Sequence, residues 1–143
     1  MKFNCLIITI FLFIIPHVSA KDKIFGNATL LEVTSIYDGD TFRANIEGFP
    51  AVIGEHMSIR INGIDTPELR GKCDEEKQLA RLAKQFTAER LRAAKSVVLK
   101  NIKRGKYFRL IADVYVDGVN LGEQLIKHGH AVKYKGKTKQ AWC

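Results

Sequence analysis

Short apolar runs rich in β-branched and aromatic residues recur along the chain, each bounded by turn residues, and this pattern predicts strands. Residues 28–37 and 41–46 form two such runs, joined by Asp-Gly, a strong hairpin signal. Residues 57–64 give a third strand, and residues 96–102 and 109–116 give two more. We therefore expect a meander of five strands in which neighbours run antiparallel.

Two other segments repeat their apolar positions with the period of a helix. In residues 74–95, six side chains fall within an arc of about 140° at 100° per residue. They are Leu79, Ala83, Phe86, Thr87, Leu91 and Ala94. A shorter helix is expected over residues 120–128, followed by Gly129 at the position where glycine commonly ends a helix. A chain of 143 residues has room for one core. The elements predict one α+β domain, mainly a β-barrel: a five-stranded OB-type barrel with two to three helices.

Residues 1–20 have the composition of a secretory signal peptide. Lys2 is followed by an almost unbroken apolar run over residues 5–15, and small residues end the segment. A transmembrane anchor is the alternative, but about eleven apolar residues fall short of the roughly 20 that a spanning helix needs. We expect cleavage after Ala20, a domain over residues 21–143, no membrane attachment after cleavage, and a secreted or periplasmic protein.

The chain from Lys21 onward keeps 22 of the 23 basic residues and all 15 acidic ones, a formal charge of +7. Such an excess favours an anionic partner, although it also serves solubility alone. Five basic side chains crowd residues 100–109, and lysines alternate over residues 133–139. Either cluster is equally compatible with a solvated face.

Removal of residues 1–20 takes Cys5 with it and leaves Cys73 and Cys143. An even pair of cysteines in an oxidising compartment favours a disulfide, and only one intramolecular pairing is available. In the chain-entropy model, closing a loop of this length stabilises the fold by roughly 4 kcal/mol. Two unpaired thiols are the alternative.

Four carboxylates lie in two turn regions of the predicted barrel. Asp38 and Asp40 stand between the first two strands, and Asp65 and Glu68 directly follow the third. Pro67 has a fixed φ and restricts the residue before it, so Asp65 and Glu68 are held in a defined relation. Acids gathered around one point would repel without a cation, and oxygen ligands favour a hard ion, Ca²⁺ or Mg²⁺. Taken singly, the first turn is more often a plain hairpin turn and the second a helix-entry cap.

Two arginines lie on strands next to these turns. With Ile59 and Ile61 directed to the core, strand alternation sends the side chain of Arg60 to the opposite face. Arg109 begins the fifth strand, after Lys106, Tyr107 and Phe108. Either arginine alone would be an ordinary surface residue. A guanidinium fork, however, binds two phosphate oxygens at once, which suits a phosphodiester substrate.

Five motifs in a fixed order resemble the staphylococcal nuclease family, over about residues 31–134. They are YDGDTF, an arginine followed by GIDTPE, KYFR, DVYVDG and NLGEQLIKHG. The resemblance implies an OB-fold barrel with helices and a calcium-dependent nuclease that cuts DNA and RNA to leave 3′-phosphates.

The resemblance also assigns roles to individual residues. Asp40, Asp65 and the Thr66 carbonyl would ligate Ca²⁺, with Asp38 just outside the coordination sphere. Glu68 would orient or deprotonate the attacking water. The remaining implied residues contact the substrate. Arg60 and Arg109 would clamp the scissile phosphate, and the substrate-binding residues beside this clamp would be Lys106, Tyr107 and Tyr134.

The chain departs from the family in two places. After its second helix it has only a basic tail, residues 133–143, where the family's type member carries a third helix. A bond between Cys73 and Cys143 would fasten that tail beside the site. Phe108 stands where the family usually has glycine, which is expected to reshape the pocket near Arg109.

Two classes of function are compatible with these residues. One is a secreted calcium-dependent nuclease acting on DNA and RNA as a monomer, and the other is a non-catalytic OB module that binds nucleic acid or another polyanion. A binding module has no need of a general base beside a pair of metal ligands. The sequence therefore favours the nuclease.

Overall fold

The structure is a computed structural model of the 143-residue chain and describes residues 23–143. The predicted signal peptide lies outside the described residues. Among the residues described, no helix has both the length and the apolar character needed to cross a membrane.

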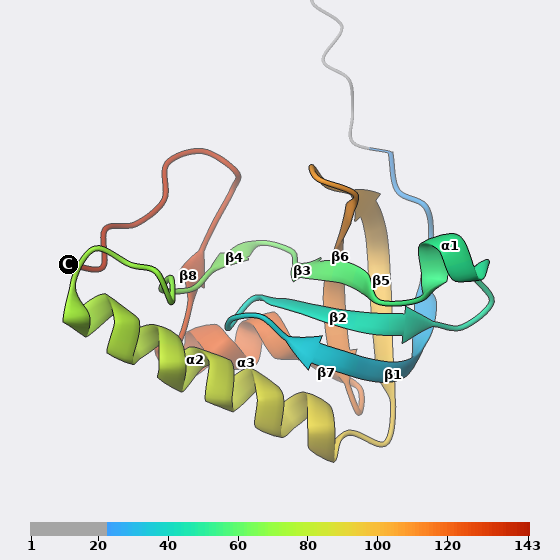
Figure 1. Cartoon of the computed structure of the whole chain (residues 1–143), viewed down its shortest axis with the longest axis horizontal. Coiled ribbons are helices and arrows are strands. Elements are labelled where there is room, and N and C mark those ends of the chain that lie inside the picture. The colour runs from blue at the N-terminus through green and yellow to red at the C-terminus, as the bar shows by residue number, and fades with distance from the viewer. Residues whose placement is uncertain (1–22) are drawn as a thin grey trace, which may run out of the picture.

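Five strands close into a barrel, as predicted (Figure 1). They are β1 (Ala28–Ile36), β2 (Thr41–Ile46), β3 (Met57–Ile61), β5 (Val97–Arg104) and β6 (Arg109–Val116). Four of the pairings around the barrel are antiparallel. The fifth pairing joins β3 to β6 in parallel and closes the ring, with Arg60 opposite Ile111 and Ser58 opposite Arg109. The expectation of antiparallel neighbours throughout was therefore wrong at this seam, because closing a ring with an odd number of strands forces at least one parallel contact.

The barrel interior is filled by the inward-facing side chains of alternate strand positions. Phe42, Ile59, Leu99 and Val114 are completely buried there. Ile61 and Ile102 complete the same core cluster, into which helices also pack. In β3 the burial pattern alternates strictly, so the side chain of Arg60 leaves the barrel on the face opposite to Ile59 and Ile61.

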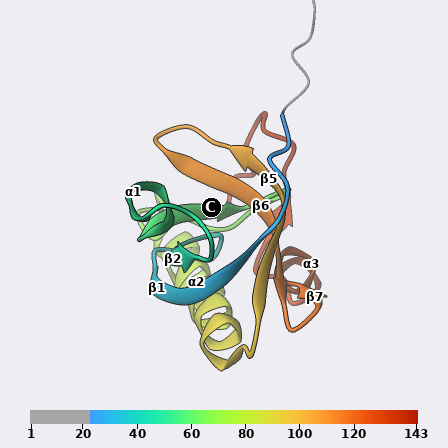
Figure 2. The same ribbon diagram turned by 90° about the vertical axis from the view of Figure 1, so that its right-hand side faces the viewer.

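Three helices accompany the barrel within residues 23–143: α1 (Ala51–Gly54), α2 (Asp74–Ala93) and α3 (Leu121–Lys127). The two long predicted helices are present, each slightly shorter than expected. The one-turn helix α1 was missed because four residues carry no helical period. Figures 1 and 2 show α2 running along one side of the barrel, with α1 at the barrel end where β3 begins.

The predicted third strand is interrupted. A turn at Asn62-Gly63, with Gly63 at φ 76°, separates β3 from the short β4 (Ile64–Asp65). β4 pairs with β8 (Val132–Lys133), and β7 (Val119–Asn120) extends β6 through a hairpin. The β4–β8 pairing brings the C-terminal tail to the turn that carries the Asp65 motif.

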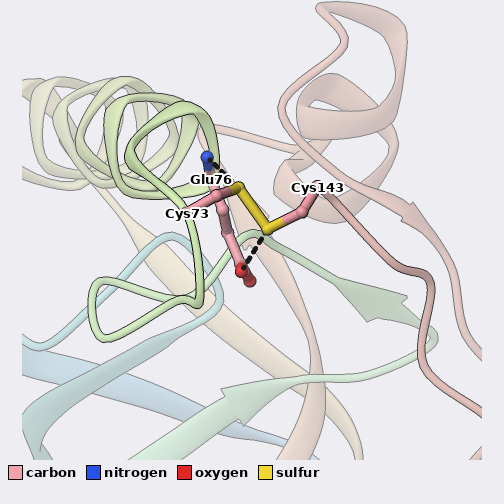
Figure 3. A group of neighbouring side chains, drawn as sticks. All are labelled: Cys73, Glu76 and Cys143. Atoms are coloured by element: carbon pink, nitrogen blue, oxygen red, sulfur yellow. Dashed lines mark hydrogen bonds between the residues drawn. A yellow bond between two sulfur atoms is a disulfide. The ribbon is translucent and has the colours of Figure 1, made fainter.

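The tail is attached at both of its ends. At its beginning, the backbone N–H of Tyr134 donates to the carbonyl of Gly63 at 2.8 Å. At its end, Cys143 forms a disulfide with Cys73, the residue that caps the N-terminus of α2, with a Cα–Cα distance of 5.9 Å (Figure 3). The tail has no helix; instead it spans the surface between β4 and the start of α2.

Candidate active site

The Asp38–Asp40 turn is packed tightly against α2 and the turn that follows β4. A Cβ on Gly39 would lie 2.7 Å from Cβ of Ala83 and 2.9 Å from Cγ2 of Thr66, so only glycine fits. The hydroxyl of Thr87 on α2 donates to the Gly39 carbonyl at 2.6 Å. These contacts fix the position of the turn and bury the carboxylates on either side of it.

One guanidinium joins the two predicted acidic turns. Arg60 Nη1 donates to Asp40 Oδ1 at 2.6 Å, and Arg60 Nη2 donates to Asp65 Oδ1 at 3.1 Å. The backbone N–H of Thr66 also donates to Asp40 Oδ2, at 3.3 Å. Asp40 and Asp65 are almost fully buried, and the Arg60 side chain is 15% exposed. Residues 25 positions apart in the sequence therefore meet at one point, on the outer face of the barrel wall.

Glu68 stands beside this point on a turn that a buried glutamate organises. The Glu76 carboxylate, on the first turn of α2, accepts from the backbone N–H groups of Glu68 at 3.2 Å and Lys72 at 3.0 Å. Gly71 is required here, since a Cβ would come within 2.3 Å of that carboxylate. From the sequence alone, Glu76 is one of three acidic residues in the first turn of α2, where the helix dipole favours negative charge. A buried acid next to a glycine-containing turn is the signal that would have indicated its second role.

Lys139 is the site residue that sequence reasoning missed. Its ammonium lies 2.5 Å from Glu68 Oε1 and 3.1 Å from Asp65 Oδ1. It comes from the tail, four positions before the disulfide-bonded Cys143. In the sequence it was one of four alternating lysines, with nothing to single it out. A positive charge held between these two carboxylates offsets part of their mutual repulsion and fixes the otherwise half-exposed Glu68 side chain.

The pKa values of the site reflect burial first and the neighbouring charges second. Burial, followed by the charge of Asp40, raises the pKa of Asp38 to about 7. Burial likewise raises the pKa of Asp40, although Arg60 opposes the shift. Burial alone would lower the pKa of Arg60, but the charges of Asp40 and Asp65 outweigh it, and the pKa is raised. Carboxylates that resist ionisation at a shared point are the electrostatic setting in which a cation binds favourably.

Arg109 lies on the same face of the barrel wall as Arg60, but it does not reach the acidic residues. In the parallel β3–β6 register it pairs with Ser58, two positions from Arg60, which corresponds to about 7 Å along the strands. Its Nε is buried and has no hydrogen-bond partner among the described residues. It lines an apolar pocket instead. Buried polar atoms without a partner are uncommon in native structures.

The three implied substrate-binding residues fall into two groups. Lys106 and Tyr107 are exposed at the tip of the β5–β6 hairpin, and Tyr107 is 92% exposed. Tyr134, near the beginning of the tail, is half-buried, and its ring lies 6.0 Å from the Arg60 guanidinium carbon. Tyr134 therefore lies beside the acidic residues, whereas the hairpin tip projects from the barrel near Arg109.

Metal-ligating side chains converge most closely at a different place. Cys73, Glu76 and Cys143 present ligand atoms within 4.8 Å of one another, and among residues 23–143 no three carboxylates of the Asp40–Asp65 site do so. Figure 3 shows, however, that the two sulfurs are bonded to each other, which removes the thiolates that a metal would need. This group is a disulfide with a neighbouring carboxylate. The donors available at Asp40 and Asp65 are all oxygens, the set that hard cations prefer.

The raised pKa of Asp38 gives a testable pH dependence. The pKa of the Asp38 carboxyl is about 7 in the folded state, against a usual pKa of 3.8. Between pH 3.8 and pH 7 the folded protein therefore binds a proton at Asp38 that the unfolded chain does not. In chelator, the stability contributed by this group is therefore full near pH 4 and is lost as the pH rises to 7, by up to about 2–4 kcal/mol. Asp38→Asn should flatten that part of the curve of free energy of unfolding against pH. Parallel curves for the two proteins would contradict the assignment.

Residues 58–142 match the family described as staphylococcal nuclease homologue. A probable endonuclease of Schizosaccharomyces pombe is 31% identical, over 73% of this chain and 55% of its own length. A probable endonuclease of Schizosaccharomyces japonicus is 32% identical, over 73% of this chain and 54% of its own length. A probable staphylococcal-like nuclease of Oryza sativa subsp. japonica is 29% identical over 62% of this chain and 17% of its own length. The chain spans about half the length of the two yeast relatives.

The family match covers more than half of the chain and includes β3 from Ser58 onward, the Asp65 turn, Arg109 and the tail as far as Trp142. The closed barrel agrees with the OB fold that the five motifs implied. The chain belongs to the staphylococcal nuclease family.

Proposed function

We propose that the protein is a calcium-dependent nuclease that hydrolyses phosphodiester bonds of DNA and RNA and leaves 3′-phosphates. The observation that carries the proposal is the single guanidinium of Arg60 bound to two buried aspartates from separate turns, with the half-exposed carboxylate of Glu68, paired with Lys139, beside them. A structural barrel has no use for this arrangement, because burying three charges costs more than an apolar substitute would. Nuclease names among the relatives support the same reading.

A calcium ion would be held by Asp40, Asp65 and the Thr66 carbonyl, with water completing its shell. The oxygen-only donor set and the raised pKa values of Asp38 and Asp40 support this choice. When bound, the ion supplies positive charge to a phosphodiester oxygen. Asp38, which accepts the backbone N–H of Asp40 at 3.1 Å, orients that turn.

The remaining roles belong to side chains of this chain. Glu68 takes a proton from the water that attacks phosphorus, and Lys139 holds its carboxylate in place. Arg60 and Arg109 neutralise charge that develops on the non-bridging oxygens. A general base contributes about 10²- to 10⁴-fold, whereas enzymes lower barriers by about 8–23 kcal/mol, so charge stabilisation has to supply most of the rate enhancement.

Digestion of single-stranded and duplex DNA tests the proposal. We expect cleavage with Ca²⁺, none with EGTA, and 3′-phosphate ends on the products. Asp65→Asn should abolish cleavage, and Asp74→Asn, which alters an exposed acid at the start of α2, should not. Binding of the DNA without any cleavage under these conditions would overturn the nuclease and favour the non-catalytic OB module.

An exported location is part of the proposal. It is supported by the signal-peptide composition of residues 1–20 and by the Cys73–Cys143 disulfide, a bond that persists in oxidising compartments. Detection of the intact chain, with residues 1–20 still attached, in the cytoplasm alone would contradict it.

A further inference from the structure

We propose that an apolar pocket beside Arg109 binds one unstacked base of a nucleic acid while Arg109 binds the adjoining phosphate. The inference rests on the proposed function for the class of ligand, and it adds a subsite for one base. None of the acidic site residues lines the pocket, whose lining includes Ile53 of α1 and Met57 at the start of β3. Figure 1 shows α1 close to the start of β3, and Figure 2 shows α1 from another side.

Three phenylalanines from distant parts of the sequence line this pocket. Phe25 precedes β1, Phe49 precedes α1, and Phe108 ends the β5–β6 hairpin; Ile53 of α1 joins them. The cavity has a volume of about 290 Å³. The phenylalanines remain 55%, 37% and 60% exposed, respectively. An exposed aromatic cluster is unfavourable in water unless it serves a partner, so this surface is suited to a flat apolar group of limited size.

The hairpin tip is held in a costly backbone conformation that keeps its aromatic rings in solvent. Tyr107 and Phe108 both have positive φ, 58° and 53°. Bulky residues rarely adopt this region, and each instance costs of order 1–3 kcal/mol. The backbone N–H of Gly105 donates to the Arg109 carbonyl at 2.6 Å and closes the turn. In this conformation Phe108 lines the pocket and stays 60% exposed instead of entering the core.

Charge at the rim of the pocket selects the occupant. Arg104 and Arg109 both line it, and the buried Nε of Arg109 lacks a partner. A lipid tail or a second copy of this chain would cover the phenylalanines but leave these guanidinium groups without an anion. A nucleotide matches both the phenylalanines and the arginines of the pocket. Its base stacks on the aromatic rings, and its phosphate pairs with arginine.

The position of Arg109 links the pocket to the acidic residues. Because Arg109 and Arg60 leave the same face of the β3–β6 seam two register positions apart, a strand of nucleic acid that follows the seam passes from one to the other. A base can enter the pocket only if it leaves the stack of a duplex, which costs a few kcal/mol. Occupation of the pocket therefore requires a base that has left its stack.

An abasic-site scan tests the subsite without relying on hydrolysis. Affinity is measured in EGTA for short oligothymidylates of one length, each with one abasic residue at a different position. For the unmodified protein, we expect the abasic residue to weaken binding about 5- to 150-fold at one position and little elsewhere, as for the loss of one stacked base. In Phe49→Ala and Phe108→Ala that position should lose its effect. The control Leu82→Ala, a 51% exposed apolar residue on α2, should keep it.

Each outcome bears on a stated part of the proposal. A uniform response to the abasic residue, or an unchanged response in both phenylalanine variants that fold normally by circular dichroism, overturns the base subsite while leaving the nuclease intact. Absence of any oligonucleotide binding overturns the subsite and removes nucleic acid as the ligand. Association of the protein with itself that Phe49→Ala abolishes, seen by sedimentation, would assign the surface to a second copy instead.

Discussion

Replacing Arg60 by methionine should lower the free energy of unfolding by about 3–5 kcal/mol and abolish cleavage of nucleic acid. The guanidinium is the shared partner of Asp40 and Asp65, both almost fully buried, so its removal leaves two carboxylates in the protein without a counterion. It also leaves the Ile64 carbonyl without a donor, since Arg60 Nη2 binds this atom at 3.2 Å. Urea unfolding at neutral pH in chelator measures the loss of stability.

Arg43→Met is the matched control for this substitution. Arg43 lies on the neighbouring strand β2, is exposed, and has the same length and charge, so its loss should change stability by no more than about 0.5 kcal/mol. Arg60→Lys separates charge from geometry. One ammonium is unable to span two carboxylates and a carbonyl, so we expect most of the activity to be lost despite the retained charge. Equal stability of the two methionine variants would show that Arg60 is not the counterion of this site.

Glu68→Gln should reduce kcat by about 10²- to 10⁴-fold while changing stability and calcium affinity little. The amide has the shape of the carboxylate and still accepts a hydrogen bond from Lys139, but it does not take a proton from water. Glu68 is half-exposed, so its neutralisation leaves no buried charge unpaired. Single-turnover cleavage with saturating Ca²⁺ measures the rate, and calorimetric titration measures the affinity.

Glu75→Gln serves as the control for Glu68, because Glu75 is an exposed acid on the first turn of α2, seven residues away. It should leave the rate unchanged. Full activity in Glu68→Gln would remove Glu68 from the chemistry. A large loss of calcium affinity in the same variant would instead make Glu68 a metal ligand and leave the base to be found elsewhere.

The tail shows how a short sequence with no helical period still contributes to a site. Residues 133–143 have neither the apolar spacing of a helix nor the alternation of a long strand. Pairing of β8 with β4 positions one end, the disulfide positions the other, and Lys139 between them reaches Glu68 and Asp65. Because both attachments are to distant parts of the chain, the role of Lys139 followed from the fold and not from its local sequence.

The sequence by itself determined the five barrel strands, the two long helices and the residue types of the acidic cluster. Each of these depends on local information: alternation of apolar residues, helical spacing, and turns whose glycine and proline restrict the backbone. Motif order was sufficient to indicate the family because several short segments agreed independently. The direction of Arg60 was also predictable, since strand alternation alone sends it to the face opposite to Ile59.

Only the tertiary structure decided what those residues meet. The parallel β3–β6 seam, the joining of Asp40 and Asp65 by Arg60, the burial of Glu76 beneath the Glu68 turn, and the contact of Lys139 with Glu68 all link positions whose separation carries no local signal. The same holds for the pocket that gathers Phe25, Phe49 and Phe108 around Arg109. Such contacts arise because closing the barrel and packing α2 against it bury the most apolar surface. The arrangement that buries the most apolar surface depends on the whole chain and not on any single segment.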